Sequence, residues 1–226
     1  MTGTPTTTVP AWLCGPWVRT ARTIDDAPPE ECSDVVWLQV GPWFADLRLP
    51  RPGRTPTHPF DTAHAFSGRL EVLGPVGGGA RVAWHHDLDT DASDPGDDHT
   101  GDPDTAVVGV RDAVLIESGD GYVEWWERPR DPSGGADHGP VDDGRVLESG
   151  GGPGEPVACR VVCTGGMAVA VWSDPVPGGA WCSSGTGWEP ARVVGAVPAG
   201  LDLGRVLRAL AAGDPVGSGW REVGER

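Results

Sequence analysis

Most of the eleven tryptophans in this chain lie in short segments where apolar and polar residues alternate. Such alternation predicts β-strands, because successive side chains of a strand point to opposite faces of the sheet. In three segments, Phe44–Arg48, Trp84–Asp87 and Tyr122–Glu127, ionisable side chains lie beside aromatic rings. Charge and indole on one wall suit a polar-lined cavity, whereas a plain apolar core avoids buried charge. The pattern therefore indicates a β-barrel with a ligand pocket.

The order of the segments predicts an all-β fold. Strand segments follow one another as hairpins, and strand–helix–strand alternation is absent, which argues against a parallel sheet. A sandwich and an up-and-down barrel both remain open, and the long meander favours the barrel. We predict an antiparallel up-and-down barrel of about ten strands. We expect a disordered N-terminus at 1–10, a single barrel domain over 11–226, and long acidic loops at 89–104 and 129–143.

One amphipathic helix is predicted late in the chain. Asp202 is a suitable N-cap, and Gly213 followed by Pro215 is a stop signal. Apolar residues at helical spacing form one face of this helix: Leu203, Val206, Leu207 and Leu210. A single apolar face predicts packing against the outside or one end of a sheet.

Charge and composition exclude several classes of function. The formal net charge of −16 argues against nucleic acid and anionic membrane surfaces as partners, because both require a basic footprint. Apolar runs fall short of the ~20 residues of a membrane helix. The Thr-rich start does not resemble a secretory signal, and the odd number of cysteines indicates reduced thiols. We therefore expect a cytoplasmic protein.

Several short motifs resemble those of a group of largely uncharacterised bacterial proteins with a lipocalin-like (calycin-type) β-barrel. They are Val36–Gln39, Phe44–Pro50, Trp84-His85 with Asp89, Glu124 with Trp126, and Trp220–Glu222. The resemblance touches about half of the chain, mainly before residue 130. It implies a lipocalin-like barrel and supplies no reaction.

Asp46 and Arg48 lie two residues apart and share a strand face with Phe44. They are either a guanidinium oriented by its carboxylate inside the cavity, where it would grip an anionic or carbonyl ligand, or an outward surface ion pair. The opposite face, which includes Trp43 and Leu47, is fully apolar. Either that face is the core and Asp46 is solvated, or the barrel wall packs outward on another element.

His85 and His86 point to opposite faces of their strand. His86 shares its face with Trp84 and is the better candidate for the interior, whereas His85 matches the family motif. A histidine in a cavity can act as a general acid or base, or as an axial haem ligand as in nitrobindin-like barrels. A hydrogen-bonded histidine without catalytic function is the competing interpretation for each.

Glu117 and Glu124 lie on neighbouring predicted strands. A carboxylate buried near Tyr122 and Trp126 would have a raised pKa and could transfer a proton. The two glutamates could also form a retaining-glycosidase pair, although nothing else in the sequence indicates a sugar site. Paired surface carboxylates are the alternative in so acidic a chain.

The aspartates from Asp87 to Asp98 superficially match a calcium loop. Ala92 stands where that loop requires glycine, and the twelfth residue is Asp98 in place of glutamate, so a solvated loop is favoured over a metal site. Glycine-rich turns between strands do not indicate nucleotide binding.

These observations lead to one main functional hypothesis. The barrel encloses a mostly apolar small molecule, which contacts Trp37, Trp84, Tyr122 and Trp126, and which is anchored by Asp46, Arg48, His85 or His86, and Glu124. As an enzyme it would be a cofactor-free acid–base isomerase, cyclase or dehydratase using His85, His86, Glu117 or Glu124. The alternatives are a haem- or ligand-binding protein without catalysis, and an acidic protein-interaction module. We expect a monomer or homodimer.

Overall fold

The structure is a computed structural model of the 226-residue chain. It describes residues 8–25, 27–55, 61–90, 103–129, 144–150, 157–173, 177–183, 190–198, 201–212, 214–217 and 219–223. Most of the two long acidic segments and residues 1–7 lie outside these ranges. Val9, within the predicted disordered N-terminus, packs against the barrel core.

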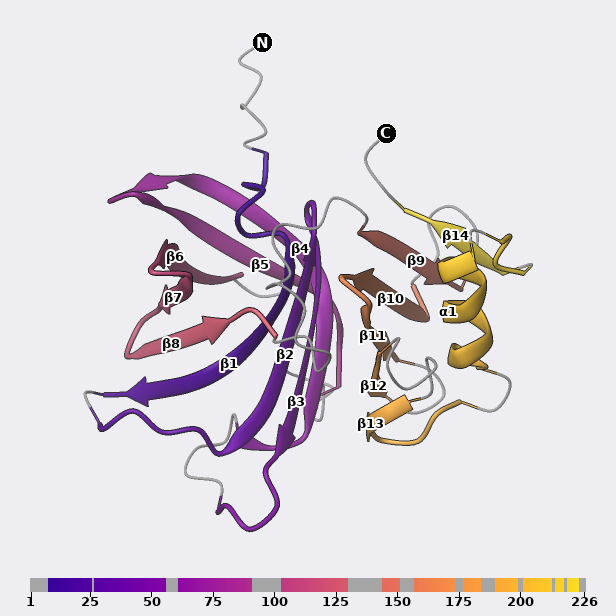
Figure 1. The fold of residues 1–226 in the computed structure, drawn as a ribbon, viewed down its shortest axis with the longest axis horizontal. Coiled ribbons are helices and arrows are strands. Elements are labelled where there is room, and N and C mark those ends of the chain that lie inside the picture. The colour runs from indigo at the N-terminus through magenta and orange to yellow at the C-terminus, as the bar shows by residue number, and fades with distance from the viewer. Residues whose placement is uncertain are drawn as a thin grey trace.

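The first eight strands form a closed antiparallel barrel in which each strand pairs with its neighbour in sequence and β8 pairs with β1 (Figure 1). These strands are β1 (Gly15–Ile24), β2 (Ser33–Val40), β3 (Trp43–Pro50), β4 (His64–Val76), β5 (Gly79–Asp89), β6 (Asp104–Arg111), β7 (Val114–Ser118) and β8 (Tyr122–Glu127). Closure leaves no open sheet edge, because the first and last strands satisfy each other's backbone groups.

The later strands form a second, six-stranded sheet with the order β13-β12-β11-β10-β9-β14. They are β9 (Arg145–Ser149), β10 (Cys159–Thr164), β11 (Met167–Trp172), β12 (Gly178–Ser183), β13 (Pro190–Val194) and β14 (Trp220–Glu222). The single helix among the described residues, α1 (Leu203–Ala212), lies on the face of this sheet away from the barrel (Figure 1).

Helix α1 has the predicted cap and packing face. The carboxylate of Asp202 accepts a hydrogen bond from the backbone N–H of Arg205 at 2.8 Å, which satisfies one of the free donors of the first turn. The buried side chains of the helix pack on the second sheet, against Leu147 and Val161. The helix residues in this contact are Leu203, Val206, Leu207 and Leu210. The predicted stop residue Gly213 lies outside the described residues.

The outer wall of the barrel packs against the second sheet. Leu47 on β3 and Ala65 on β4 belong to the same buried cluster as Val162 and Val169 of the second sheet. The approach is close at Gly179 of β12, where an added Cβ would lie 2.4 Å from the Cβ of Ala65. The apolar outer face of β3 is therefore a packing surface between the two sheets.

One buried arginine adds a polar connection between the two sheets. Arg160 of β10 is 1% exposed and forms ion pairs with Glu148 of β9 and with Asp87 of barrel strand β5. Its guanidinium also lies over the ring of Trp43, 4.5 Å from the centroid. Two carboxylates and an aromatic face thus replace the water that this charge loses on burial.

The predicted all-β antiparallel barrel with one late helix is confirmed. The strand count is slightly different, because the barrel closes with eight strands and the remaining six form the second sheet. Within the part of the chain that the structure describes, no helix is long and apolar enough to cross a membrane.

Candidate functional site

The barrel is filled at one end and hollow at the other. Core side chains that include Leu13, Val82 and Leu115 fill the closed end. The other end holds a cavity of about 540 Å³, which is within the usual range for a small-molecule site. Its aromatic wall is formed by Phe44, Phe66, Trp37, Trp84, Tyr122 and Trp126.

Three tryptophans on non-adjacent strands meet where the filled and hollow ends join. The ring of Trp37 contacts Trp84 edge-on at 5.9 Å and Trp126 edge-on at 5.5 Å between centroids. The indole nitrogen of Trp37 donates a hydrogen bond to Gln39, whereas the buried nitrogen of Trp126 has no hydrogen-bond partner. The wall is therefore a packed aromatic cluster with one buried donor that lacks an acceptor.

A β-bulge on β1 turns two arginines into the barrel. The pairing of β1 with β8 shifts by one residue between Arg19 and Ala21, so that Arg19 pairs with Trp126 and Arg22 pairs with Glu124. Without the bulge, residues three apart would face opposite sides of the strand. Strict alternation could not predict both arginines on the inside, and neither was predicted from the sequence.

Arg19 is the most deeply buried charge of the barrel. Its guanidinium is 0% exposed and forms ion pairs with Glu31, at 2.7 Å, and with Glu124. Burial lowers the pKa of Arg19, but the attraction of Glu124 and Glu31 is stronger, and the net shift is upward. Arg22 is similarly paired with Asp61. Arg19 therefore joins Glu31 and Glu124 in one buried ion-pair network beside the cavity.

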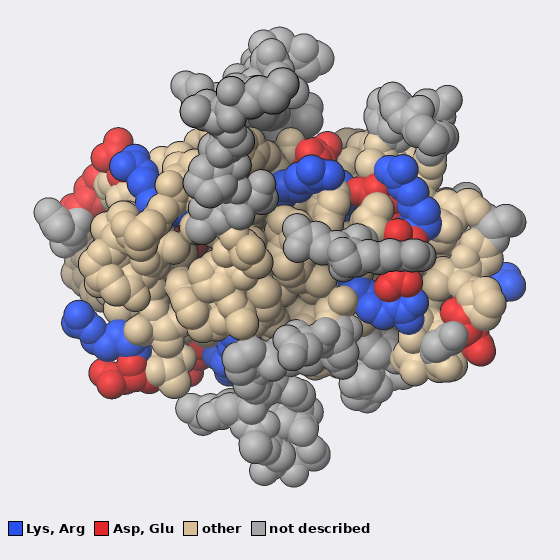
Figure 2. Space-filling view, turned by 90° about the horizontal axis from the view of Figure 1, so that it is seen from above, with Lys and Arg blue, Asp and Glu red and all other residues tan. Residues whose placement is uncertain are grey.

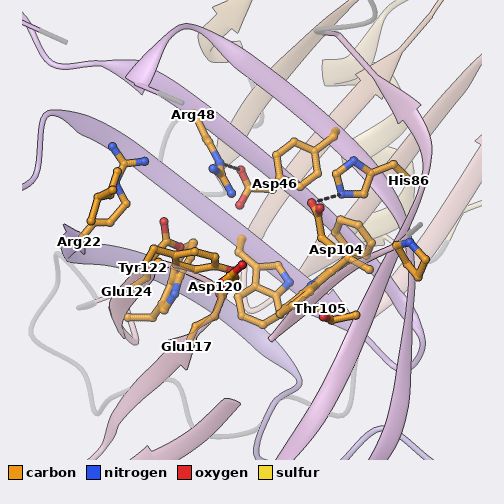
Figure 3. A pocket seen from close by; sticks show the side chains of 18 of the residues that line it. Arg22, Asp46, Arg48, His86, Asp104, Thr105, Glu117, Asp120, Tyr122 and Glu124 are labelled. Carbon is orange, nitrogen blue, oxygen red and sulfur yellow. Dashed lines mark hydrogen bonds and ion pairs between the residues drawn. The ribbon is translucent and has the colours of Figure 1, made fainter. Parts of the chain in front are cut away.

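Asp46 and Arg48 face into the cavity, as Figure 3 shows. The Nε of Arg48 donates a hydrogen bond to Asp46 at 2.9 Å, and the guanidinium lies over Phe66. Burial lowers the pKa of Arg48, but the negative charges of Asp46 and Glu124 raise it by more than burial lowers it. The side chain therefore stays charged. The sequence left open whether the apolar face of this strand is the barrel core or packs outward on another element. The structure shows that it packs outward on the second sheet.

Glu117 and Glu124 are direct cross-strand partners on β7 and β8 and both line the cavity. Glu124 is held by Arg19, whereas Glu117 accepts a hydrogen bond from the hydroxyl of Tyr122 at 2.8 Å. Burial, followed by the negative charge of Glu124, raises the pKa of Glu117 to about 8. The pair thus combines a salt-bridged carboxylate with a carboxyl group that holds its proton near neutral pH.

A second bulge and a glycine position His86. Asp87 is the extra residue between the pairs Gly68–His86 and Ser67–Leu88, so His86 faces inward and Leu88 faces the second sheet. A Cβ on Gly68 would lie 1.7 Å from the carbonyl oxygen of His85. Only glycine allows the backbones to approach this closely.

His86 is held by a carboxylate that a second histidine also contacts. Its Nδ1 lies 3.0 Å from Asp89, and the other oxygen of Asp89 lies 2.6 Å from Nε2 of His64. A carboxylate only accepts hydrogen bonds, so both histidine nitrogens that contact Asp89 carry protons. The ring of His86 stacks on Phe66 at 4.5 Å, and its buried Nε2 has no hydrogen-bond partner. The nearest carboxylate to that Nε2 is Asp104, at 3.6 Å.

Acidic side chains surround the mouth of the cavity. Asp25, Asp104 and Asp120 all line it, and the side chain of Asp104 is 75% exposed. Cations on the lining are limited, within the described residues, to Arg22 and Arg48, and both are paired with carboxylates. Among the described residues of the lining, formal negative charges therefore outnumber positive ones.

The structure brings together all but one of the residues that we singled out from the sequence. The cavity is lined by Trp37, Asp46, Arg48, Trp84, His86, Glu117, Tyr122, Glu124 and Trp126. His85 lies elsewhere: its side chain is 45% exposed on the outer face and pairs with Glu71 at 3.1 Å. We therefore do not retain His85 as a site residue, because it cannot reach a ligand in the cavity.

The calcium hypothesis falls mostly outside the described residues, because positions 91–98 are not included in them. Asp87 and Asp89 have other partners, Arg160 and the two histidines. Over the described ranges, no group of three or more acidic, histidine or cysteine side chains is arranged to hold a metal ion.

Comparison with known proteins adds information on the fold only. No protein-family model matches the chain, and no curated protein matches it. The crystal structure of the uncharacterised protein YLR301w from Saccharomyces cerevisiae is similar, with a TM-score of 0.58 and 13% sequence identity over 83% of this chain and 89% of that chain. An eight-stranded closed antiparallel barrel with this neighbour is consistent with a lipocalin-like barrel.

Proposed function

We propose that this protein binds a small, mostly apolar molecule inside its barrel and performs cofactor-free acid–base chemistry on it. The reaction class is an isomerisation, cyclisation or dehydration, in a protein related to the lipocalin-like bacterial group. Its cytoplasmic location and its monomeric or homodimeric state stay predictions. The observation that carries the proposal is the arrangement of His86, whose Nε2 lies buried at the cavity without a hydrogen-bond partner while Asp89 holds its Nδ1.

In this arrangement His86 is the proton-transfer group. The proton on Nδ1 stays with Asp89, so the lone pair of Nε2 is available to accept a proton from the substrate and return it at another atom. Asp89 stabilises the imidazolium that forms, and His64 holds Asp89 in place. The tryptophans provide the apolar wall for the substrate body.

The polar anchor lies on the other side of the cavity. Figure 3 shows Tyr122, Glu117 and Glu124 on one side and His86 with Asp104 on the other. A substrate that spans the cavity would place its polar group against the glutamates and its reacting atoms beside His86. Fixing both ends limits the number of substrate conformations, which is how a cavity accelerates cyclisation.

Binding is testable without knowledge of the natural ligand. N-phenyl-1-naphthylamine, a neutral apolar fluorophore, is expected to bind the parent protein with about 1:1 stoichiometry. Thr105→Trp fills the mouth, because Thr105 lines the cavity, and should abolish binding. Thr55→Trp, at an exposed position outside the lining, is the control. Equal binding to the parent and to Thr105→Trp would place the probe outside the barrel and contradict the proposal.

Catalysis is tested with the neighbouring histidines as a matched pair. Small molecules released from natively purified protein, identified by mass spectrometry, are returned to the parent, His86→Asn and His85→Asn. We expect His86→Asn to lower turnover by about 10²–10⁴-fold, the usual contribution of one acid–base group. His85→Asn should leave turnover unchanged, because His85 lies on the outer face. Equal rates in all three proteins would refute the acid–base function.

Haem binding without catalysis is the second candidate, favoured by the same Nε2 of His86, which has no hydrogen-bond partner and lies 3.6 Å from Asp104. The residues fit less well at the mouth, where Asp25, Asp104 and Asp120 would face the anionic propionates. A Soret band in haem-titrated parent protein that disappears in His86→Asn would support this candidate. The absence of haem uptake would exclude it.

The interaction-module alternative depends largely on acidic loops outside the described residues. On the face seen in Figure 2, basic and acidic side chains are interspersed among the coloured residues. A basic partner would require an extended acidic surface, so this face does not favour the alternative.

A further inference from the structure

Acidic residues outnumber arginines on the described lining of the cavity. The arginines are Arg22 and Arg48, and the acidic residues are Asp25, Asp46, Asp104, Glu117, Asp120 and Glu124. Arg48 is paired with Asp46, and Arg22 is paired with Asp61, which lies outside the lining. An anionic ligand would have to displace these carboxylates, so the arginines do not form an anion site.

Glu117 is the carboxyl group of the cavity interior that lacks a cation. It is 7% exposed and accepts a hydrogen bond from the neutral hydroxyl of Tyr122. The groups that face it are Glu124 and Tyr122 from β8, and Arg48 and Asp46 from β3. Glu124 and Arg48 are already engaged with Arg19 and Asp46. A ligand cation would complete the pairing at Glu117.

The walls of the cavity also suit a cation. Trp37, Trp84, Trp126 and Tyr122 line the same space, and the electron-rich faces of such rings attract ammonium groups most strongly when water is excluded. Asp25, Asp104 and Asp120 at the mouth would raise the local concentration of cations and repel anions. The aromatic walls, the buried carboxyl group without a cation and the acidic mouth are independent features, and each of them favours a cationic ligand.

We infer that the natural ligand is an organic cation, an amine or quaternary ammonium compound with an apolar body, whose positive group lies against Glu117 and the aromatic wall. This inference rests on the proposed small-molecule function and specifies its ligand class. The apolar body extends along the tryptophans toward His86. Binding ionises Glu117, so it releases up to one proton near neutral pH.

Three ligands of one shape test the inference. Phenethyltrimethylammonium is the cation, 3,3-dimethylbutylbenzene is its neutral carbon isostere, and 3-phenylpropanoate is an anion of similar size. Binding is measured by tryptophan quenching, and the proton balance of the cation by calorimetry in two buffers. We expect the cation to bind at least about tenfold tighter than the isostere, which corresponds to 1.4 kcal/mol. Its affinity should rise between about pH 6.5 and 8.5, and that of the isostere should not.

Two variants localise the effect. Glu117→Gln should remove the preference for the cation and the proton release while retaining the neutral isostere. Glu71→Gln, on the exposed outer face, should leave both unchanged. Equal or tighter binding of the isostere or the anion to the parent would refute the cation inference and leave the small-molecule function standing. Failure of all three ligands and of N-phenyl-1-naphthylamine would refute both.

Discussion

Glu117 shows how a single buried residue gives the whole protein a pH dependence. Its carboxyl group faces Glu124 without a cation of its own, and its pKa rises from 4.5 to about 8 on folding. Between these values the folded state binds more protons than the unfolded state. The stability that this group contributes is therefore fully present below about pH 4.5 and is lost as the pH rises through about 8.

Replacing Glu117 should remove the pH dependence that this residue gives to the free energy of unfolding. We expect Glu117→Gln to be more stable than the parent above about pH 8, by on the order of 5 kcal/mol, with the difference shrinking toward pH 5. Urea unfolding at about pH 5, 7 and 9 measures it. The exposed Glu71→Gln is the control. Parallel stability curves for the parent and Glu117→Gln would contradict the assignment.

At the scale of elements, two β-bulges aim the polar residues of the site. The bulge on β1 brings both Arg19 and Arg22 inside, and the bulge on β5 separates His86 from Leu88. Gly68 is required at the second bulge, because β4 and β5 approach each other closely there. The same irregularity turns Asp87 outward to Arg160. The bulges therefore serve both the cavity and the packing of the second sheet.

Gly68→Ala should destabilise the pairing of β4 with β5 at the bulge. Its Cβ would collide with a backbone carbonyl, so we expect a loss of about 1–3 kcal/mol in the free energy of unfolding, together with a displaced His86 ring. Gly109→Ala on β6 is the matched control, because its Cβ would come no closer than 3.5 Å to Gly79. Denaturant unfolding measures the stability of both variants. Equal stabilities would show that β4 and β5 move apart at Gly68 without loss of stability, and would contradict the prediction.

At the scale of the whole molecule, the barrel depends on the second sheet. Leu47 is 2% exposed although it points away from the cavity, since the second sheet covers it. We expect Leu47→Ala to lower the free energy of unfolding by about 2–5 kcal/mol while ligand binding is retained. Leu73→Ala, at a 49% exposed position, is the control. A Leu47→Ala protein of unchanged stability would show that the barrel does not require this contact.

The sequence alone determined which local structure each segment adopts. Alternation located the strands of the barrel, and Asp202 with four apolar side chains located α1 and its packing face. Alternation also placed Trp84 and His86 on one face and His85 on the other, because these residues precede the bulge. Tyr122, Glu124 and Trp126 lie on an unbroken strand, so alternation also places all three on the face that lines the cavity.

The tertiary structure alone decided which face of β3 became the inside and which arginines of β1 point into the barrel. Trp43–Leu49 contains an apolar face and a polar face, and only the covering second sheet makes the apolar one the outer face. Arg19 and Arg22 both point into the barrel because a bulge on β1 changes the alternation between them, and that bulge depends on pairing with β8. Strand periodicity is local to the chain, whereas burial, register and closure depend on contacts between segments far apart in sequence.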